Sequence, residues 1–117
     1  MGLILRENNL SGDLSSLLKP LSRCLDLSLI SYLDVSYNTF TSLGPLRELL
    51  PNLAILDVER NQLTQLSPQS LPATLQQLSF NHNQISVLSD DLGLISPRLT
   101  SIQGGHNCLS TIPRTVL

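Results

Sequence analysis

Two histidines, a cysteine and a serine are the side chains in this sequence whose types and spacing come closest to chemistry. His82 and His106 lie 24 residues apart, and Cys108 follows closely after the second of them. Imidazole and thiolate groups are zinc ligands, but a closed zinc site takes about four of them. Ser79 precedes His82 by three residues, yet no acidic residue stands where it would orient the imidazole as a base. The sequence therefore predicts no catalytic residue, no metal site, no cofactor and no enzymatic activity.

Three acidic residues form a second group whose spacing matters. Asp34 and Asp57 stand at the same position of two similar sequence phrases, and Glu59 follows shortly after. If the phrases form neighbouring strands, which lie about 4.8 Å apart, the two aspartates repel each other unless a cation satisfies them. Two interpretations stay open: a solvated acidic face without a fixed partner, or a face that meets a lysine or arginine of a protein partner.

The elements that would position these groups are copies of one phrase. Its clearest copy, at 53–63, reads LAILDVERNQL and fits the pattern L-x-x-L-x-L-x-x-N-x-L with valine at the third leucine position. Similar phrases occupy 30–40, 75–85 and 99–109, and residues 3–10 enter the same phrase part-way. The pattern resembles that of the leucine-rich repeat family, intracellular type, in which each unit supplies one strand and one tight bend.

This resemblance covers nearly the whole chain and implies an α/β fold. The expected architecture is a right-handed leucine-rich repeat solenoid, a horseshoe arc with a short parallel β-sheet on its concave face. The convex face would carry 3₁₀, helical or extended returns. We expect a single domain over residues 1–117 with about five units, at 1–29, 30–52, 53–74, 75–98 and 99–117.

Period-two alternation divides each phrase into a buried and an exposed set. The positions expected in the core are Leu3, Leu5, Leu10, Leu33, Val35, Phe40, Leu56, Val58, Leu63, Leu78, Phe80, Ile85, Ile102 and Leu109. The residue between the two core leucines faces solvent, so one exposed column should contain Ile4, Asp34, Asp57, Ser79 and Gln103. In the last unit Gly104 takes a core position, which indicates either a fraying terminal repeat or room for another chain.

One asparagine recurs in every phrase, and its role is expected to be structural. Its amide side chain is both donor and acceptor, so it can satisfy the backbone of its own turn and of the next. We therefore expect an asparagine ladder made of Asn8, Asn38, Asn61, Asn83 and Asn107. Their spacings of 30, 23, 22 and 24 residues show that the first unit carries an insert.

The insert and the later returns carry their own signals. Asp13 is a helix cap, and leucines at helical spacing predict a helix over 14–25 that Pro20 interrupts or delays. A second short helix or 3₁₀ turn should start at Pro45.

The third and fourth returns are less regular in sequence. Prolines 68 and 72 favour an extended or 3₁₀ third return. Ser89, Asp90 and Asp91 favour a single helical turn in the fourth, broken early by Gly93.

Composition bounds the class of partner. The chain has 117 residues, 28 of them leucine, and a formal net charge of −2 without a basic stripe, which argues against nucleic acid. No apolar run reaches 18 residues, so no membrane span is expected. A cytoplasmic location is favoured by the two lone cysteines, Cys24 and Cys108, and by the lack of an apolar leader after Met1. Within the cytoplasm, the protein could be associated with a cilium or with the cytoskeleton.

Together these features predict a non-enzymatic module for protein binding or scaffolding that uses its concave face. The partner would present a basic segment. The alternative is a structural subunit of a ciliary or cytoskeletal assembly, held by uncapped solenoid edges, with edge-on association through the first strand. The residues expected to bind protein are Tyr32, Asp34, Tyr37, Ile55, Asp57, Glu59, Arg60, Gln77, Asn81 and His82.

Overall fold

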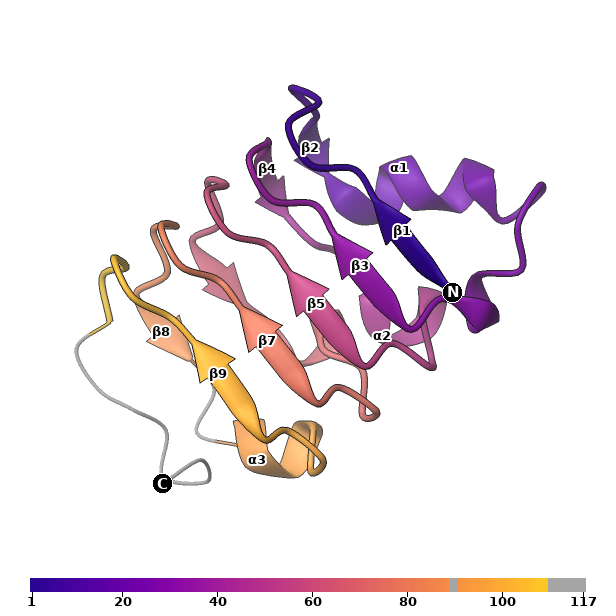
Figure 1. Ribbon diagram of the computed structural model, residues 1–117. Helices are drawn as coiled ribbons and strands as arrows, with labels where there is room; N and C mark the ends of the chain where they lie inside the picture. Colours follow the sequence, from indigo (N-terminus) through magenta and orange to yellow (C-terminus); the bar gives the residue numbers. More distant parts are fainter. Residues whose placement is uncertain (89–90, 110–117) are drawn as a thin grey trace.

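Five short parallel strands form the main sheet of the protein. The computed structural model describes residues 1–88 and 91–109. The strands are β1 (Gly2–Ile4), β3 (Tyr32–Asp34), β5 (Ile55–Asp57), β7 (Gln77–Ser79) and β9 (Ser101–Gln103). Their order in the sheet follows the chain, β1-β3-β5-β7-β9, and every pair is parallel (Figure 1). The predicted α/β class with a parallel sheet is thus confirmed, whereas the unit boundaries stay predictions.

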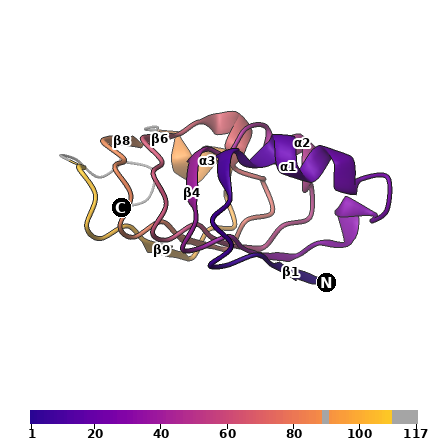
Figure 2. The same cartoon turned by 90° about the horizontal axis from the view of Figure 1, so that it is seen from above.

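The returns between these strands lie on one side of the sheet (Figure 2). They hold three helices and two 3₁₀ turns: α1 (Leu14–Leu21), η1 (Leu27–Leu29), α2 (Leu46–Leu49), η2 (Pro68–Ser70) and α3 (Leu92–Ile95). None of the helices in the described part of the chain is long and apolar enough to cross a membrane.

Two small parallel strand pairs, which the sequence did not predict, complete the returns. The first joins β2 (Ser11–Asp13) to β4 (Thr39–Ser42), and the second joins β6 (Gln65–Leu66) to β8 (Val87–Leu88). They hold successive returns together on the side opposite the main sheet.

Helix α1 starts as predicted and ends earlier. The Asp13 carboxylate accepts a hydrogen bond from the Ser15 amide, which satisfies one free N–H of the first turn. The predicted end at residue 25 is wrong, because the helix ends at Leu21. There the amide of Ser22 bonds to the Lys19 carbonyl, three residues back, and this tighter geometry closes the last turn.

The short helices show which local signals decided their ends. Helix α2 follows Pro45, as predicted. The single helical turn predicted for the fourth return is confirmed by α3, but the expectation that Gly93 breaks it early is wrong, because Gly93 lies inside this helix. That helix stops before Ser96, whose backbone is kept from the helical region by the following proline, Pro97. The proposed helix-start residues Ser89 and Asp90 lie outside the described residues.

An arginine of α2 ties three returns together. The Nη1 atom of Arg47 donates to the carbonyl oxygen of Leu71 at 3.2 Å and to that of Ile95 at 3.1 Å. Because these carbonyls belong to the third and fourth predicted units, one guanidinium bridges the second unit to both.

The core lies between the sheet and the returns, and the leucine pattern located it correctly. Leu33, Leu56 and Leu78 are paired in register across β3, β5 and β7, and each is at most 1% exposed. The predicted core residues of the first and last units are only partly buried: Leu3, Leu5, Leu10, Ile102 and Leu109.

Four of the five recurring asparagines, all except Asn8, bond to the backbone of two units at once. Asn61 is 7% exposed, and its Nδ2 atom donates to the carbonyls of Val58 and Glu59 in its own unit and of Val35 in the preceding one. Its Oδ1 atom accepts from the Phe40 amide at 3.0 Å. Asn38, Asn83 and Asn107 repeat this arrangement. The bonds therefore reach the preceding unit, whereas the sequence-based expectation was the following one.

The glycine at a core position of the last unit has a packing explanation. A Cβ atom on Gly104 would lie 2.4 Å from the Phe80 ring. Phe80 replaces the smaller aliphatic residue of the pattern, and its ring fills the space that a leucine at 104 would take. The presence of glycine at position 104 therefore needs neither of the two predicted explanations, a fraying terminal repeat or room for another chain.

Candidate functional site

The outward face of the main sheet is the surface that the predicted site residues share, and it has a defined register. Tyr32, Ile55, Gln77 and Ser101 form one column across the strands, and Asp34, Asp57, Ser79 and Gln103 form another. Each three-residue strand presents its first and third side chains on this face, so adjacent columns lie side by side.

A shallow hollow lies on this face, and we call it the sheet-face hollow. Its volume is about 260 Å³. Its lining comes from Tyr32, Ile55, Leu56, Asp57, Glu59, Gln77, Leu78, Ser79, Ser101 and Gln103. Five of the predicted binding residues therefore meet here: Tyr32, Ile55, Asp57, Glu59 and Gln77. Site prediction missed Ser79, Ser101 and Gln103, although the period-two pattern already placed them in the same columns.

Asp34 does not join this hollow, which corrects the picture of a solvent-facing acidic pair. It is 4% exposed, and its Oδ1 atom accepts from the Ser36 amide at 3.0 Å and the Ser36 hydroxyl at 2.6 Å. A carboxylate that is buried and bonded within its own strand end is not free to bind a partner's cation. The alternation pattern could not show this, since it contains no information on a hydroxyl two residues away.

Asp57 and Glu59 supply the negative charge of the hollow. Asp57 is half-buried, and its Oδ1 atom accepts from the Glu59 amide at 3.1 Å. Burial raises the pKa of Asp57 above its ordinary value of 3.8, against the lowering effect of the hydrogen bond from the Glu59 amide. The negative charges of Asp34 and Glu59 add to the rise, and the positive charge of Arg6 opposes it. Half-burial of both carboxylates argues against the interpretation of a fully solvated acidic face.

Asn81 holds the Glu59 side chain in place. Its Nδ2 atom donates to Glu59 Oε1, and its Oδ1 atom accepts from the Gly105 amide at 2.6 Å. The amide thereby links three neighbouring units. Asn81 thus acts on the site through Glu59 rather than lining the hollow.

We expect Asp57→Asn to stabilise the protein at neutral pH. A raised pKa means that ionisation disfavours the folded state, so the contribution of Asp57 is fully present below pH 3.8 and is lost as the pH rises through its folded pKa. Asparagine never ionises. The gain at pH 7 should be less than about 1 kcal/mol, because solvent screens a half-exposed group. Urea unfolding at pH 7 and pH 3 measures it, and the difference should vanish at pH 3.

Asp26 provides the control of opposite sign. Hydrogen bonds from the Ser28 hydroxyl and amide lower its pKa, so Asp26→Asn should not stabilise at pH 7. A gain of equal size in both variants would show that the removal of net charge, and not the environment of Asp57, is responsible.

The remaining predicted residues, Tyr37, Arg60 and His82, lie at the bends that follow the strands. Each directly precedes a ladder asparagine and has a positive φ, between 55° and 59°. Glu7 and His106 share this conformation. The rings of His82 and His106 stack at a centroid distance of 4.1 Å. Over the described residues no group of three or more histidine, cysteine or acidic side chains is arranged to hold a metal ion.

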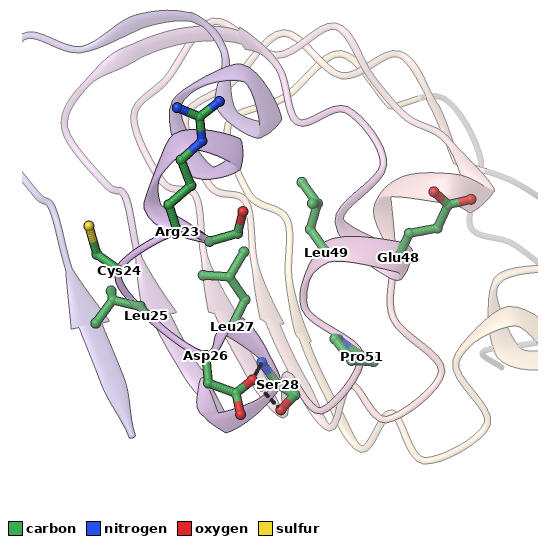
Figure 3. Close-up of a pocket in the computed structure, with 10 residues that line it drawn as sticks. Arg23, Cys24, Leu25, Asp26, Leu27, Ser28, Glu48, Leu49 and Pro51 are labelled. Carbon is green, nitrogen blue, oxygen red and sulfur yellow. Dashed lines mark hydrogen bonds between the residues drawn. The ribbon is translucent and has the colours of Figure 1, made fainter.

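A larger hollow lies beside α1 and α2, on the side of the returns (Figure 3). It is lined by residues 22–28, which follow α1, and by Glu48, Leu49 and Pro51. Its acidic residue Asp26 is already bonded to Ser28, as the dashed lines in Figure 3 show. The sheet-face hollow has more of the features of a protein-binding site, because it joins two partly buried carboxylates to a tyrosine and an isoleucine.

The repeated strand and bend, stacked in register on its neighbours, places the chain among the repeat proteins. No family model matches the chain. Fibromodulin from Gallus gallus is 32% identical over 81 residues, which are 69% of this chain and 21% of the relative. Leucine-rich repeat-containing protein 23 from Bos taurus is 42% identical over 73 residues, which are 62% of this chain and 20% of the relative. The chain thus spans about a fifth of the length of these relatives.

The chain belongs to the leucine-rich repeat family. Membership of this family indicates a protein-interaction module in general terms. The absence of enzymatic activity stays a prediction.

The predicted cytoplasmic location is wrong. Fibromodulins are secreted proteins of the extracellular matrix, which also removes the support for the intracellular type and for the cilium- or cytoskeleton-associated variant. The prediction relied on two lone cysteines and on the lack of an apolar leader. Cys24 and Cys108 are free and exposed, so they bear no structural mark of either compartment. The missing leader has no weight in a chain that spans so little of its relatives.

Proposed function

We propose that the chain is part of a right-handed leucine-rich repeat solenoid that binds a protein partner on its sheet face. A lysine or arginine of the partner enters the sheet-face hollow and pairs with Asp57 and Glu59. Tyr32 and Ile55 supply apolar contact beside it. The observation that carries the proposal is the gathering of two half-buried carboxylates and two large side chains in one hollow.

The physical argument is the partial desolvation of the Asp57 carboxylate. Burial raises its pKa although Arg6 acts in the opposite direction, and a partner's ammonium or guanidinium group would stabilise the ionised form further. Tyrosine at such a site adds contact area at a low entropic cost, as it does at interface hot spots. The destabilisation expected from ionised Asp57 is typical of a residue retained for binding rather than for folding.

The test is a comparison of captured partners. Immobilised wild-type protein and the Asp57→Arg/Tyr32→Ala double variant are exposed to an extract of the native source. A partner of the sheet face should bind the wild type and be lost from the double variant. The matched control, Glu48→Arg/Leu49→Ala, alters the returns-side hollow and should retain the partner.

Circular dichroism of all three proteins checks that each is folded. Asp57→Asn repeats the comparison without a bulky side chain and should weaken the same partner. If every captured protein binds the double variant as well as it binds the wild type, the sheet face is not the binding surface.

A further inference from the structure

A row of stacked planar side chains crosses the bends next to the sheet-face hollow, and we call it the cation row. It consists of Arg6, Tyr37, Arg60, His82 and His106. The Cζ atoms of Arg6 and Arg60 lie 5.0 and 5.4 Å from the centre of the Tyr37 ring. Arg60 Nη2 lies 3.5 Å from His82 Nε2, and the His82 and His106 rings stack at 4.1 Å with 9° between their planes.

The backbone holds the row in place. Left-handed φ values occur at Tyr37, Arg60, His82 and His106. The asparagine that follows each of these residues fixes this conformation. The left-handed conformation is costly for any residue other than glycine, and none of these four residues is a glycine. The repetition of the bend therefore positions the side chains one strand spacing apart, which lets planar groups stack. Stacking restrains the two arginines before any ligand arrives, which lowers the entropic cost of binding.

The positive charge of the row acts on a neighbouring carboxylate, since Arg6 opposes the rise that burial causes in the pKa of Asp57. Over residues 1–88 and 91–109, neither Arg6 nor Arg60 forms an ion pair. The pKa of His82 is lowered by partial burial and by the positive charges of Arg60 and His106, against the opposing effect of Glu59. Asn81 bonds to the Glu59 carboxylate and so restrains the acid that acts on His82. The site therefore combines an arginine fork, which stacking restrains and no ion pair within the described residues occupies, with imidazole N–H donors.

We propose that the Arg60–His82–His106 part of the cation row binds acidic side chains of the protein partner. Arg60 presents a planar fork that fits a carboxylate through two parallel hydrogen bonds, and the imidazole N–H groups add single donors beside it. Arg60 lies three residues beyond Asp57, and because the chain bends there, the two residues are at most about 10 Å apart. The inference rests on the proposed function in one respect, that both sites serve one partner. That partner therefore carries a basic residue close to acidic residues.

Two peptide probes test the two sites separately. Hexaglutamate probes the cation row, and hexalysine probes the sheet-face hollow, each followed by NMR signals of the His82 and His106 rings and of the backbone amides. Hexaglutamate should raise the pKa of His82, because bound carboxylates stabilise the imidazolium form, and it should shift the ring signals of His106. Arg60→Gln should weaken hexaglutamate about two- to fivefold, the range expected for an exposed charge pair. The control Arg23→Gln, on the returns side, should leave its affinity unchanged.

The outcomes separate this inference from the proposed function. Hexalysine should bind Arg60→Gln as well as wild type and be lost in Asp57→Asn/Glu59→Gln. If only hexalysine fails to bind, the proposed hollow is wrong and the cation row stands. The cation row is overturned if Arg60→Gln and His82→Gln, both folded by circular dichroism, bind hexaglutamate as wild type does. It is also overturned if sodium chloride at equal ionic strength, or inorganic phosphate alone, reproduces the whole effect of the peptide.

Discussion

Asn61→Asp is expected to lower the free energy of unfolding by about 3–5 kcal/mol. The substitution hardly changes the shape of the side chain, but it replaces the amide donor with a second oxygen. The carbonyls of Val35, Val58 and Glu59 would lose their donor and face a buried carboxylate. A buried polar group left unpaired costs about 1–3 kcal/mol, and an adjacent buried charge adds to this. Urea unfolding at pH 7, followed by circular dichroism, measures the change.

Asn8→Asp is the matched control. Asn8 is exposed, and its Nδ2 atom donates only to the Leu5 and Arg6 carbonyls of its own unit. Water can replace that donor, so the cost should stay below about 1 kcal/mol. Equal losses in the two variants would mean that burial between units is not what makes the central asparagine important.

Leu56→Ala is expected to cost about 2–5 kcal/mol. Leu56 is fully buried in the central strand and is paired in register with Leu33 and Leu78. Its truncation leaves a cavity in a part of the core that has neighbours on both sides and cannot easily collapse. Thermal and urea unfolding of the variant give the loss directly.

The control for this substitution is Ile4→Ala in the first strand. Ile4 is 64% exposed, so its truncation should change stability by less than about 0.5 kcal/mol. A cost at Leu56 no greater than that at Ile4 would contradict a core stacked along the leucine columns.

Much of the fold was predictable because it depends on short-range periodicity. Alternation with period two placed Leu33, Leu56 and Leu78 in one buried column, and the register agrees. Asp13 and Pro45 marked the starts of α1 and α2 because caps and first-turn prolines act within a few residues.

Features that depend on contact between units were not predictable. Gly104 is explained only by the Phe80 ring of the unit before it. The end of α3 was decided by Pro97 and not by Gly93, since a glycine inside a short helix is tolerated when packing favours the helix. The strand pairs β2–β4 and β6–β8 likewise arise from the stacking of successive returns.

The column that each residue of the candidate site occupies could be predicted from the sequence, but the burial and the contacts of the side chains could not. The column positions of Tyr32, Ile55, Asp57 and Gln77 follow from the pattern, and these residues share one hollow. The burial of Asp34 depends on Ser36, and the stack of Arg6 and Arg60 on Tyr37 depends on side-chain conformations. Neither has a signature in spacing alone.

The guanidinium of Arg47 has a mechanical consequence. Under tension along the row of strands, we expect a sheet ordered as the chain is ordered to separate one strand interface at a time. Arg47 interrupts that sequence, because it bonds to the carbonyls of Leu71 and Ile95 in two successive units. We therefore expect that separating the second unit from the fourth breaks the Arg47 bond to Ile95 as well as the contacts of the unit between them.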